Sequence, residues 1–223
     1  MKRDEPLDLV RRLYDAWNAG DVAGAARLLS PEIRWENFGG AGAVTGREGL
    51  QTTLAGGSSG GTWQMSPMAV DVLVGVTEHV IAFTRRRGQG GEVERVEVWT
   101  LRDGAAVHYR GFPLERGLDV LTETTGSRRL EAVCRGVLAF NRGEDEGWIE
   151  RFDRETLWPL QRLDDVEILA DTSAALVISV AERREAGNPA GPQYLVIAFD
   201  GGRARRASGH ATPDEALAAA RAA

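Results

Sequence analysis

An internal repeat constrains the fold of this chain more than any other feature, because both copies must form related structures. The stretch Ala16–Asp21 (AWNAGD) resembles Ala139–Glu144 (AFNRGE) at an offset of 141 − 18 = 123. Further on, Val70–Leu73 resembles Val166–Leu169 at an offset of 166 − 70 = 96. The difference, 123 − 96 = 27, indicates that the second copy lacks 27 residues of the first. The sequence therefore predicts two related domains.

The Asp-Gly pair at 103–104 recurs at 200–201, so the repeat extends through both halves. A polar stretch at 124–128 marks the boundary between a first domain, 1–125, and a shortened, degenerate second domain, 126–223. Each domain has a formal charge of −3, from 14 − 17 and 13 − 16 basic and acidic residues. Because a unit of about 100 residues buries only a modest part of its surface alone, we expect the two repeats to pack on each other.

Apolar periodicity predicts the same order of elements in each half. An i, i+3, i+4, i+7 stripe predicts an amphipathic helix over 10–17. A second helix ends at Ser30-Pro31, and Thr45–Leu50 opens a third, weaker one. The Asp-Gly pair predicts a hairpin, and Thr212-Pro213 caps a final alanine-rich helix in the second half. Alternating residues predict strands over 33–36, 70–76, 80–84, 96–101 and 107–112, followed by a short helix over 114–120. The fold class is therefore α+β, with helices first and an antiparallel meander after them.

Charge and residue counts exclude several classes of function. A net charge of −6 disfavours nucleic-acid and membrane-surface partners. The single cysteine, Cys134, cannot form an intramolecular disulfide. Lys2 is the only lysine, so a Schiff-base, pyridoxal-phosphate or phosphate-loop lysine is not available. His79, His108 and His210 show no metal-ligand spacing. We therefore expect no cofactor, no metal and no nucleic-acid or membrane partner. With no signal peptide or spanning segment in sight, a cytoplasmic location is the default.

The order of these motifs resembles the nuclear transport factor 2-like superfamily, and within it the SnoaL-like group. The resemblance rests on the Asn-Ala-Gly-Asp link between two helices, the strand Pro31–Trp35, the helix start Gly46–Leu50 and the late Asp-Gly hairpin. It covers nearly all of 7–121 and, more weakly, 130–220. It implies two cone-like domains, each with N-terminal helices packed on a curved antiparallel sheet around an apolar pocket. In this family a second copy commonly covers the open sheet face, so the repeat would form an intrachain pseudo-dimer.

The family contains cyclases, ketosteroid isomerase, epoxide hydrolases, dehydratases and proteins that only bind, so the resemblance does not decide the function. Isomerase-like members use a base aspartate where this sequence has Asn37, which cannot accept a proton. Their first-helix tyrosine falls at Leu13, and Tyr14 is rotated from it by about 100°. Their later acid falls near Val98, and the neighbouring Glu97 is expected on the opposite face. The isomerase arrangement is therefore expected to be absent.

Three residues of the first half are candidates for catalysis: Glu97, His108 and Arg110. A carboxylate on a central strand is costly unless it is paired, so Glu97 could act as an acid or base paired with Arg110. His108 and Arg110 alternate on one strand and share a face, where they could hold a carboxylate or enolate oxygen. Alternatively, His108 and Arg110 face solvent or the interface between the repeats, and Glu97 forms an ion pair at that interface. The corresponding second-half position, Tyr194-Leu195, has no carboxylate, so that half is expected to be non-catalytic.

Six residues are candidates for contacting a ligand in the first domain: Tyr14, Trp17, Trp35, Glu36, Asn37 and Trp99. The four aromatic residues could line an apolar pocket or form plain core, and Glu36 and Asn37 would lie at the mouth. The function we predict is binding of a small, largely apolar molecule, with no assigned reaction. One alternative is a SnoaL-type cyclase, isomerase or dehydratase that uses acid–base chemistry. Another is a structural or association module with a filled cone.

Overall fold

The computed structural model describes residues 5–37, 43–49, 67–88, 91–125, 128–144, 162–181, 193–200 and 203–223. The chain divides into two compact units, Met1–Gly117 and Leu118–Ala223, and each unit is described by itself. The Gly/Ser stretch at 56–61 and most of the third helix expected from Thr45 lie outside the described residues.

The division between the units falls inside helix α4 (Leu114–Thr125), earlier than the boundary expected after residue 125. In the second unit the later turns of α4 contact helix α5 (Arg128–Arg142). Asp119 Oδ1 lies 3.4 Å from Arg135 Nη2, and the Thr122 hydroxyl donates to Glu131 at 3.4 Å. Leu118–Thr125 of α4 therefore belong to the second unit.

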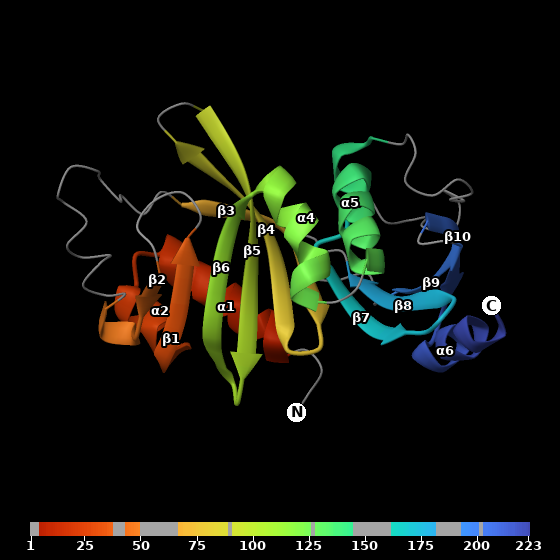
Figure 1. Cartoon of the computed structure of the whole chain (residues 1–223), viewed down its shortest axis with the longest axis horizontal. Coiled ribbons are helices and arrows are strands. Elements are labelled where there is room, and N and C mark those ends of the chain that lie inside the picture. The colour runs from red at the N-terminus through yellow and green to blue at the C-terminus, as the bar shows by residue number, and fades with distance from the viewer. Residues whose placement is uncertain are drawn as a thin grey trace. The chain divides into compact units, whose positions relative to one another are not determined.

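The first unit combines a helical start with a sheet (Figure 1). Its described elements are α1 (Glu5–Asn18), α2 (Val22–Arg27), β1 (Leu29–Asn37), β2 (Ala43–Thr45), β3 (Met68–Val76), β4 (His79–Gly88), β5 (Gly91–Arg102), β6 (Ala105–Pro113) and the first turn of α4. The strand order is β3-β4-β5-β6-β1-β2. The predicted antiparallel meander is present from β3 to β6. The expectation of a wholly antiparallel sheet is wrong, because β1 pairs with β6 in parallel. Alternating residues show which face of a strand is buried, but they do not show which distant strand pairs with it.

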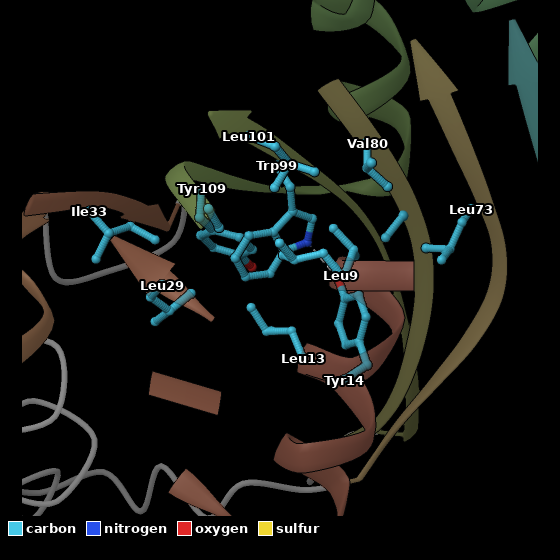
Figure 2. Close-up of a cluster of buried hydrophobic side chains, with 13 residues drawn as sticks. Leu9, Leu13, Tyr14, Leu29, Ile33, Leu73, Val80, Trp99, Leu101 and Tyr109 are labelled. Carbon is cyan, nitrogen blue, oxygen red and sulfur yellow. Dashed lines mark hydrogen bonds between the residues drawn. The ribbon is translucent and has the colours of Figure 1, made fainter. Parts of the chain in front are cut away.

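Helix α1 packs against one face of this sheet, which we call the α1 face. Val10, Leu13 and Tyr14 are each no more than 1% exposed, as the apolar stripe predicted. They join a core cluster with residues of β1 and β3 to β6, among them Leu73 and Val80 (Figure 2). The predicted hairpin between β5 and β6 is also present, because Asp103 and Gly104 both adopt positive φ angles, 52° and 75°.

The described part of the second unit contains a four-strand meander, preceded by two helices and followed by a third. Its described elements are most of α4, α5, β7 (Asp165–Asp171), β8 (Ala175–Ala181), β9 (Gln193–Asp200), β10 (Arg203–His210) and α6 (Pro213–Ala222). Neighbouring strands from β7 to β10 are antiparallel. Thr212 caps α6 in a reciprocal capping box with Glu215, which confirms the predicted helix start.

The same hydrogen-bonded clamp occurs in each unit, at the end of α1 in the first and at the end of α5 in the second. The Asn18 side chain donates to Met68 O at 2.9 Å and accepts from Met68 N at 2.8 Å. The Asn141 side chain makes the same two bonds with Leu163, both at 2.8 Å. A left-handed glycine follows each asparagine, Gly20 at φ 72° and Gly143 at φ 69°. The clamp ties each helix end to the start of the meander, at the first residue of β3 in one unit and two residues before β7 in the other.

The final hairpins of the two units also share one register. Thr100 pairs with His108 beside a bulge, and Ala198 pairs with Arg206 beside a bulge at the same distance from the turn. The offset between these hairpins is 198 − 100 = 98, rather than the 97 read from the Asp-Gly pairs. Counted from the turn, Leu195 occupies in the second hairpin the position that Glu97 occupies in the first, whereas an offset of 97 would place Tyr194 there.

Candidate functional site

Three aromatic side chains form a row across neighbouring strands on the α1 face. In register, Trp99 on β5 pairs with Tyr109 on β6, and Tyr109 pairs with Trp35 on β1. The Trp35 and Tyr109 rings stack with centroids 3.8 Å apart, and the Trp99 and Tyr109 rings tilt at 4.6 Å. Because paired residues on adjacent strands point to the same side, the register alone brings these rings together. We call Trp35, Trp99 and Tyr109 the aromatic row.

Helix α1 adds two further rings to this row from above. Tyr14 meets Trp99 edge-on at a centroid distance of 6.0 Å. Trp17, one helical turn later, lies nearly parallel to Trp35, with centroids 5.9 Å apart and an interplanar angle of 5°. Figure 2 shows Tyr14, Trp99 and Tyr109 together between α1 and the strands. The structure thus brings together Tyr14, Trp17, Trp35 and Trp99, the four aromatic residues selected from the sequence.

Glu97 lies beneath these rings, 2% exposed, in a network of donors. The Tyr14 hydroxyl donates to Glu97 Oε2, and the Tyr109 hydroxyl donates to Oε1 at 3.0 Å. Arg95 Nε lies 3.6 Å from Oε1, and the Trp99 indole N–H donates to the Tyr14 hydroxyl at 3.0 Å. We call these five residues the Glu97 network. It supplies the pairing that a buried carboxylate requires.

Burial and the nearby carboxylate keep the two phenols of the network protonated. Burial is the largest cause that raises the pKa of Tyr14 well above its usual value, and the charge of Glu97 raises it further. The pKa of Tyr109 is raised by the same two causes, while Arg95 opposes the effect. Both hydroxyls therefore remain donors to Glu97 at neutral pH.

Gly111 makes room for the polar end of the network. It pairs in register with Glu97 on β5 and with Asn37 on β1. A Cβ atom at this position would lie 2.5 Å from the Tyr109 hydroxyl oxygen and 2.7 Å from Arg95 Nη2. Any residue larger than glycine would thus displace one of these two groups. Asn37 occupies a register position on the α1 face, but its side chain lies outside the described residues.

The other polar candidates lie on the opposite face of the sheet, which we call the outer face. Arg110 pairs with Val98 while Glu97 pairs with Gly111, so Arg110 and Glu97 point away from each other. The expected pairing of Glu97 with Arg110 is therefore wrong, and Arg95 is the basic neighbour of Glu97. His108 shares the outer face with Glu36, with His108 Nε2 at 3.5 Å from Glu36 Oε1. The structure separates His108, Arg110 and Glu36 from the aromatic row.

Two histidines on the outer face couple stability to pH. Burial lowers the pKa of both His79 and His108 below 6.5, and the charge of Arg110 lowers it further. Glu78 opposes this shift at His79, and Glu36 opposes it at His108. Because the folded pKa lies below the unfolded one, the unfolded chain binds more protons as pH falls through about 6.5.

We expect the protein to lose stability between about pH 7 and pH 5, and a His79→Gln, His108→Gln variant to lose less. Urea denaturation at both pH values measures this, and an equal loss in the two proteins would contradict it.

The structure also changes the interpretation of Tyr14, which the sequence analysis placed about 100° away from the family's tyrosine position on the first helix. Leu13 and Tyr14 are both buried, and it is Tyr14 whose hydroxyl reaches the carboxylate of β5. Glu97 and Val98 do lie on opposite faces as expected, but the α1 face is the one that carries Glu97. A tyrosine and a carboxylate therefore do meet under α1, although the sequence analysis predicted no such arrangement.

Tyr109 and Arg95 belong to the site and were missed. Tyr109 alternates with His108 and Arg110 on β6, so it lies on the opposite face from this polar pair. Arg95 lies two residues before Glu97 on β5, on the same side. This i, i+2 spacing of opposite charges within an apolar strand was the available signal.

The described residues contain no cluster of three or more His, Cys, Asp or Glu side chains placed to hold a metal ion. Cys134 is fully buried, which raises the pKa of its thiol. In the part of the chain that the structure describes, no helix is long and apolar enough to cross a membrane.

Residues 10–109 match the family model of the SnoaL-like domain, so the first unit carries a SnoaL-like domain in this stretch. The stretch includes the whole aromatic row and the whole Glu97 network. This confirms the resemblance for the first half of the chain. No curated protein matches the sequence.

Solved structures similar to this chain match about half of it. An NTF2-like protein of unknown function from Burkholderia pseudomallei K96243 is 20% identical and covers 49% of this chain and 90% of its own, with a TM-score of 0.41. TerC, co-crystallised with polyporic acid, is 20% identical and covers 53% and 98%, with a TM-score of 0.43. A Mycobacterium tuberculosis protein in complex with estradiol-17beta-hemisuccinate is 15% identical and covers 48% and 92%, with a TM-score of 0.40.

Proposed function

We propose that the first unit binds a small, largely apolar, planar molecule against the aromatic row, and that Trp17 and Trp35 form the contact surface. The stacked Trp17–Trp35 pair supports this most directly. Both side chains are only partly buried, whereas Trp99 and Tyr109 behind them are 1% and 4% exposed. Partly exposed aromatic rings bind planar apolar ligands by stacking and by removing apolar area from water.

We further propose that the second unit is a shortened copy of the first, as the sequence repeat predicts. The Asn18–Met68 and Asn141–Leu163 clamps and the shared hairpin register support this duplication. In this alignment Val137 and Leu195 replace Tyr14 and Glu97. The second unit therefore has no counterpart of the Glu97 network.

A second candidate function is proton-transfer catalysis with Glu97 as the base, and one observation favours it. The carboxylate lies between two phenols in an apolar surrounding, where an acid–base group can be tuned. However, the hydroxyl protons of both phenols are already donated to Glu97. They are not available to stabilise a developing oxyanion, which acid–base chemistry at a carbonyl requires. Binding is the function that the geometry supports better.

Calorimetry with 2-naphthol as the probe tests the binding function. We expect the wild-type protein to bind 2-naphthol and Trp17→Ala to bind it at least about tenfold more weakly, because one stacking face is lost. His108→Ala, on the outer face, is the matched control and should bind like wild type. Unchanged binding in Trp17→Ala, or loss in His108→Ala, would place the ligand elsewhere. No binding of 2-naphthol to the wild type would contradict the function.

A further inference from the structure

The two hydrogen bonds between Asn18 and Met68, which we call the Asn18 clamp, end α1 directly beside the proposed contact surface. Asn18 is the last residue of α1, and Met68 is the first residue of β3. The amide group donates to Met68 O at 2.9 Å and accepts from Met68 N at 2.8 Å. Because its donor and its acceptor are both engaged, the clamp fixes the orientation of the amide as well as its distance from β3.

Trp17 lies immediately before the clamp, at the end of the apolar stripe of α1. The turn that follows is bonded to it, because Gly20 N donates to Trp17 O at 3.0 Å. Tyr14, one turn earlier, is 1% exposed, whereas Trp17 is only partly buried. Burial therefore holds the body of α1 more firmly than its end. The clamp adds a restraint at the end, where Trp17 is placed.

The contact between Trp17 and Trp35 depends on the position of the helix end. The two rings lie at 5° to each other, with centroids 5.9 Å apart. Dispersion attraction falls steeply with separation, and a gap of about 0.5–1 Å forfeits about a quarter to a half of it. A displacement of this size at the end of α1 would weaken the contact of Trp17 with Trp35 and with a ligand seated on the pair.

The second unit contains an equivalent clamp, which separates structural effects from effects on the ligand. Asn141 makes the same two bonds with Leu163, and the preceding residue, Phe140, is aromatic and partly buried like Trp17. The Asn141 bonds are partly buried, whereas the Asn18 bonds are exposed. Hydrogen bonds are stronger away from water. The contribution of the clamp to stability should therefore be at least as large in the second unit as in the first.

We infer that Asn18 is a positioning residue of the ligand site, which acts through Trp17 by holding the end of α1 in place. The inference rests on the binding function proposed above. The Asn18 amide is bonded to the backbone of Met68 rather than offered to a ligand. Loss of the clamp should thus lower the affinity for a ligand without removing a group that contacts it.

The test compares two equivalent substitutions in the full chain, Asn18→Ala and Asn141→Ala. We expect Asn18→Ala to bind 2-naphthol at least about fivefold more weakly than the wild type, and Asn141→Ala to stay within about twofold of it. Urea denaturation should show that Asn141→Ala loses at least as much stability as Asn18→Ala. A loss of affinity confined to Asn18→Ala then cannot arise from lower stability alone.

Near-ultraviolet circular dichroism supplies a second readout that a merely structural role would not move. The difference between the wild type and Trp17→Ala is the signal of the Trp17 ring in its fixed environment. Asn18→Ala should lose most of this signal, and Asn141→Ala should keep it. Should Asn18→Ala fail to fold, Asn18→Asp and Asn141→Asp provide the same comparison. Aspartate retains the acceptor for Met68 N and loses the donor to Met68 O, so we expect at least about a threefold loss of affinity in Asn18→Asp alone.

The possible outcomes separate this role from the binding function. If Asn18→Ala binds 2-naphthol like the wild type, keeps the Trp17 signal, or loses no more affinity than Asn141→Ala, Asn18 is not a positioning residue, while binding at the aromatic row stands. If the wild type does not bind 2-naphthol, the binding function itself is contradicted, and the role of Asn18 with it.

Discussion

Replacing Glu97 with alanine is expected to lower the free energy of unfolding by about 3–5 kcal/mol. The substitution leaves the Arg95 guanidinium buried without its carboxylate and removes the acceptor of the Tyr14 and Tyr109 hydroxyls. A buried polar group without a partner costs its full desolvation free energy. A hydrogen bond that is made contributes only a modest net amount to stability. Urea denaturation followed by far-ultraviolet circular dichroism measures the change.

Glu92→Ala is the matched control for this prediction. Glu92 lies on the same strand and pairs with Arg85 at 3.2 Å, but it is exposed. Surface ion pairs of this kind contribute about 0–1 kcal/mol. If Glu97→Ala cost no more than Glu92→Ala, the carboxylate would not be integrated into the core as the geometry indicates.

Trp99→Ala is expected to cost a similar amount, about 3–5 kcal/mol, through a different mechanism. Trp99 is 1% exposed and contacts Tyr14, Trp35 and Tyr109, so its removal opens a cavity beneath α1. It also takes away the donor to the Tyr14 hydroxyl. The free energy of unfolding from urea denaturation again provides the measurement.

Trp17→Ala serves as the comparison, because it removes the same side chain from the partly buried end of the same cluster. We expect this variant to lose only about 1 kcal/mol. It should therefore remain folded and be usable in the ligand experiment. Equal losses in Trp17→Ala and Trp99→Ala would show that the two ends of the cluster are equally buried.

The local elements of this chain could be predicted from residue patterns. The stripe through Leu13 on α1, the Asp103-Gly104 hairpin and the Thr212 cap depend on neighbours within a few residues. Each is found as expected. The parallel pairing of β1 with β6 could not be predicted, because it joins strands that are far apart in sequence.

For the site, residue type was a better guide than residue position. Tyr14, Trp17, Trp35 and Trp99 were selected as aromatic residues and lie in one cluster. Glu97 was selected as a costly central carboxylate, and it is buried. Its partners were misassigned, because a strand pattern shows that two faces differ without showing which face a helix covers.

The sequence by itself determined that α1 has an apolar stripe, that a carboxylate lies within a central strand and that the two halves share motifs. These are properties of short stretches, where spacing and side-chain chemistry act directly. Only the tertiary structure decided that Tyr14, Arg95 and Tyr109 surround Glu97 while His108 and Arg110 lie on the other side. The register between β5 and β6 and the docking of α1 set these contacts, and both depend on packing between distant segments. A shift of one residue in that register would exchange the faces and separate the network.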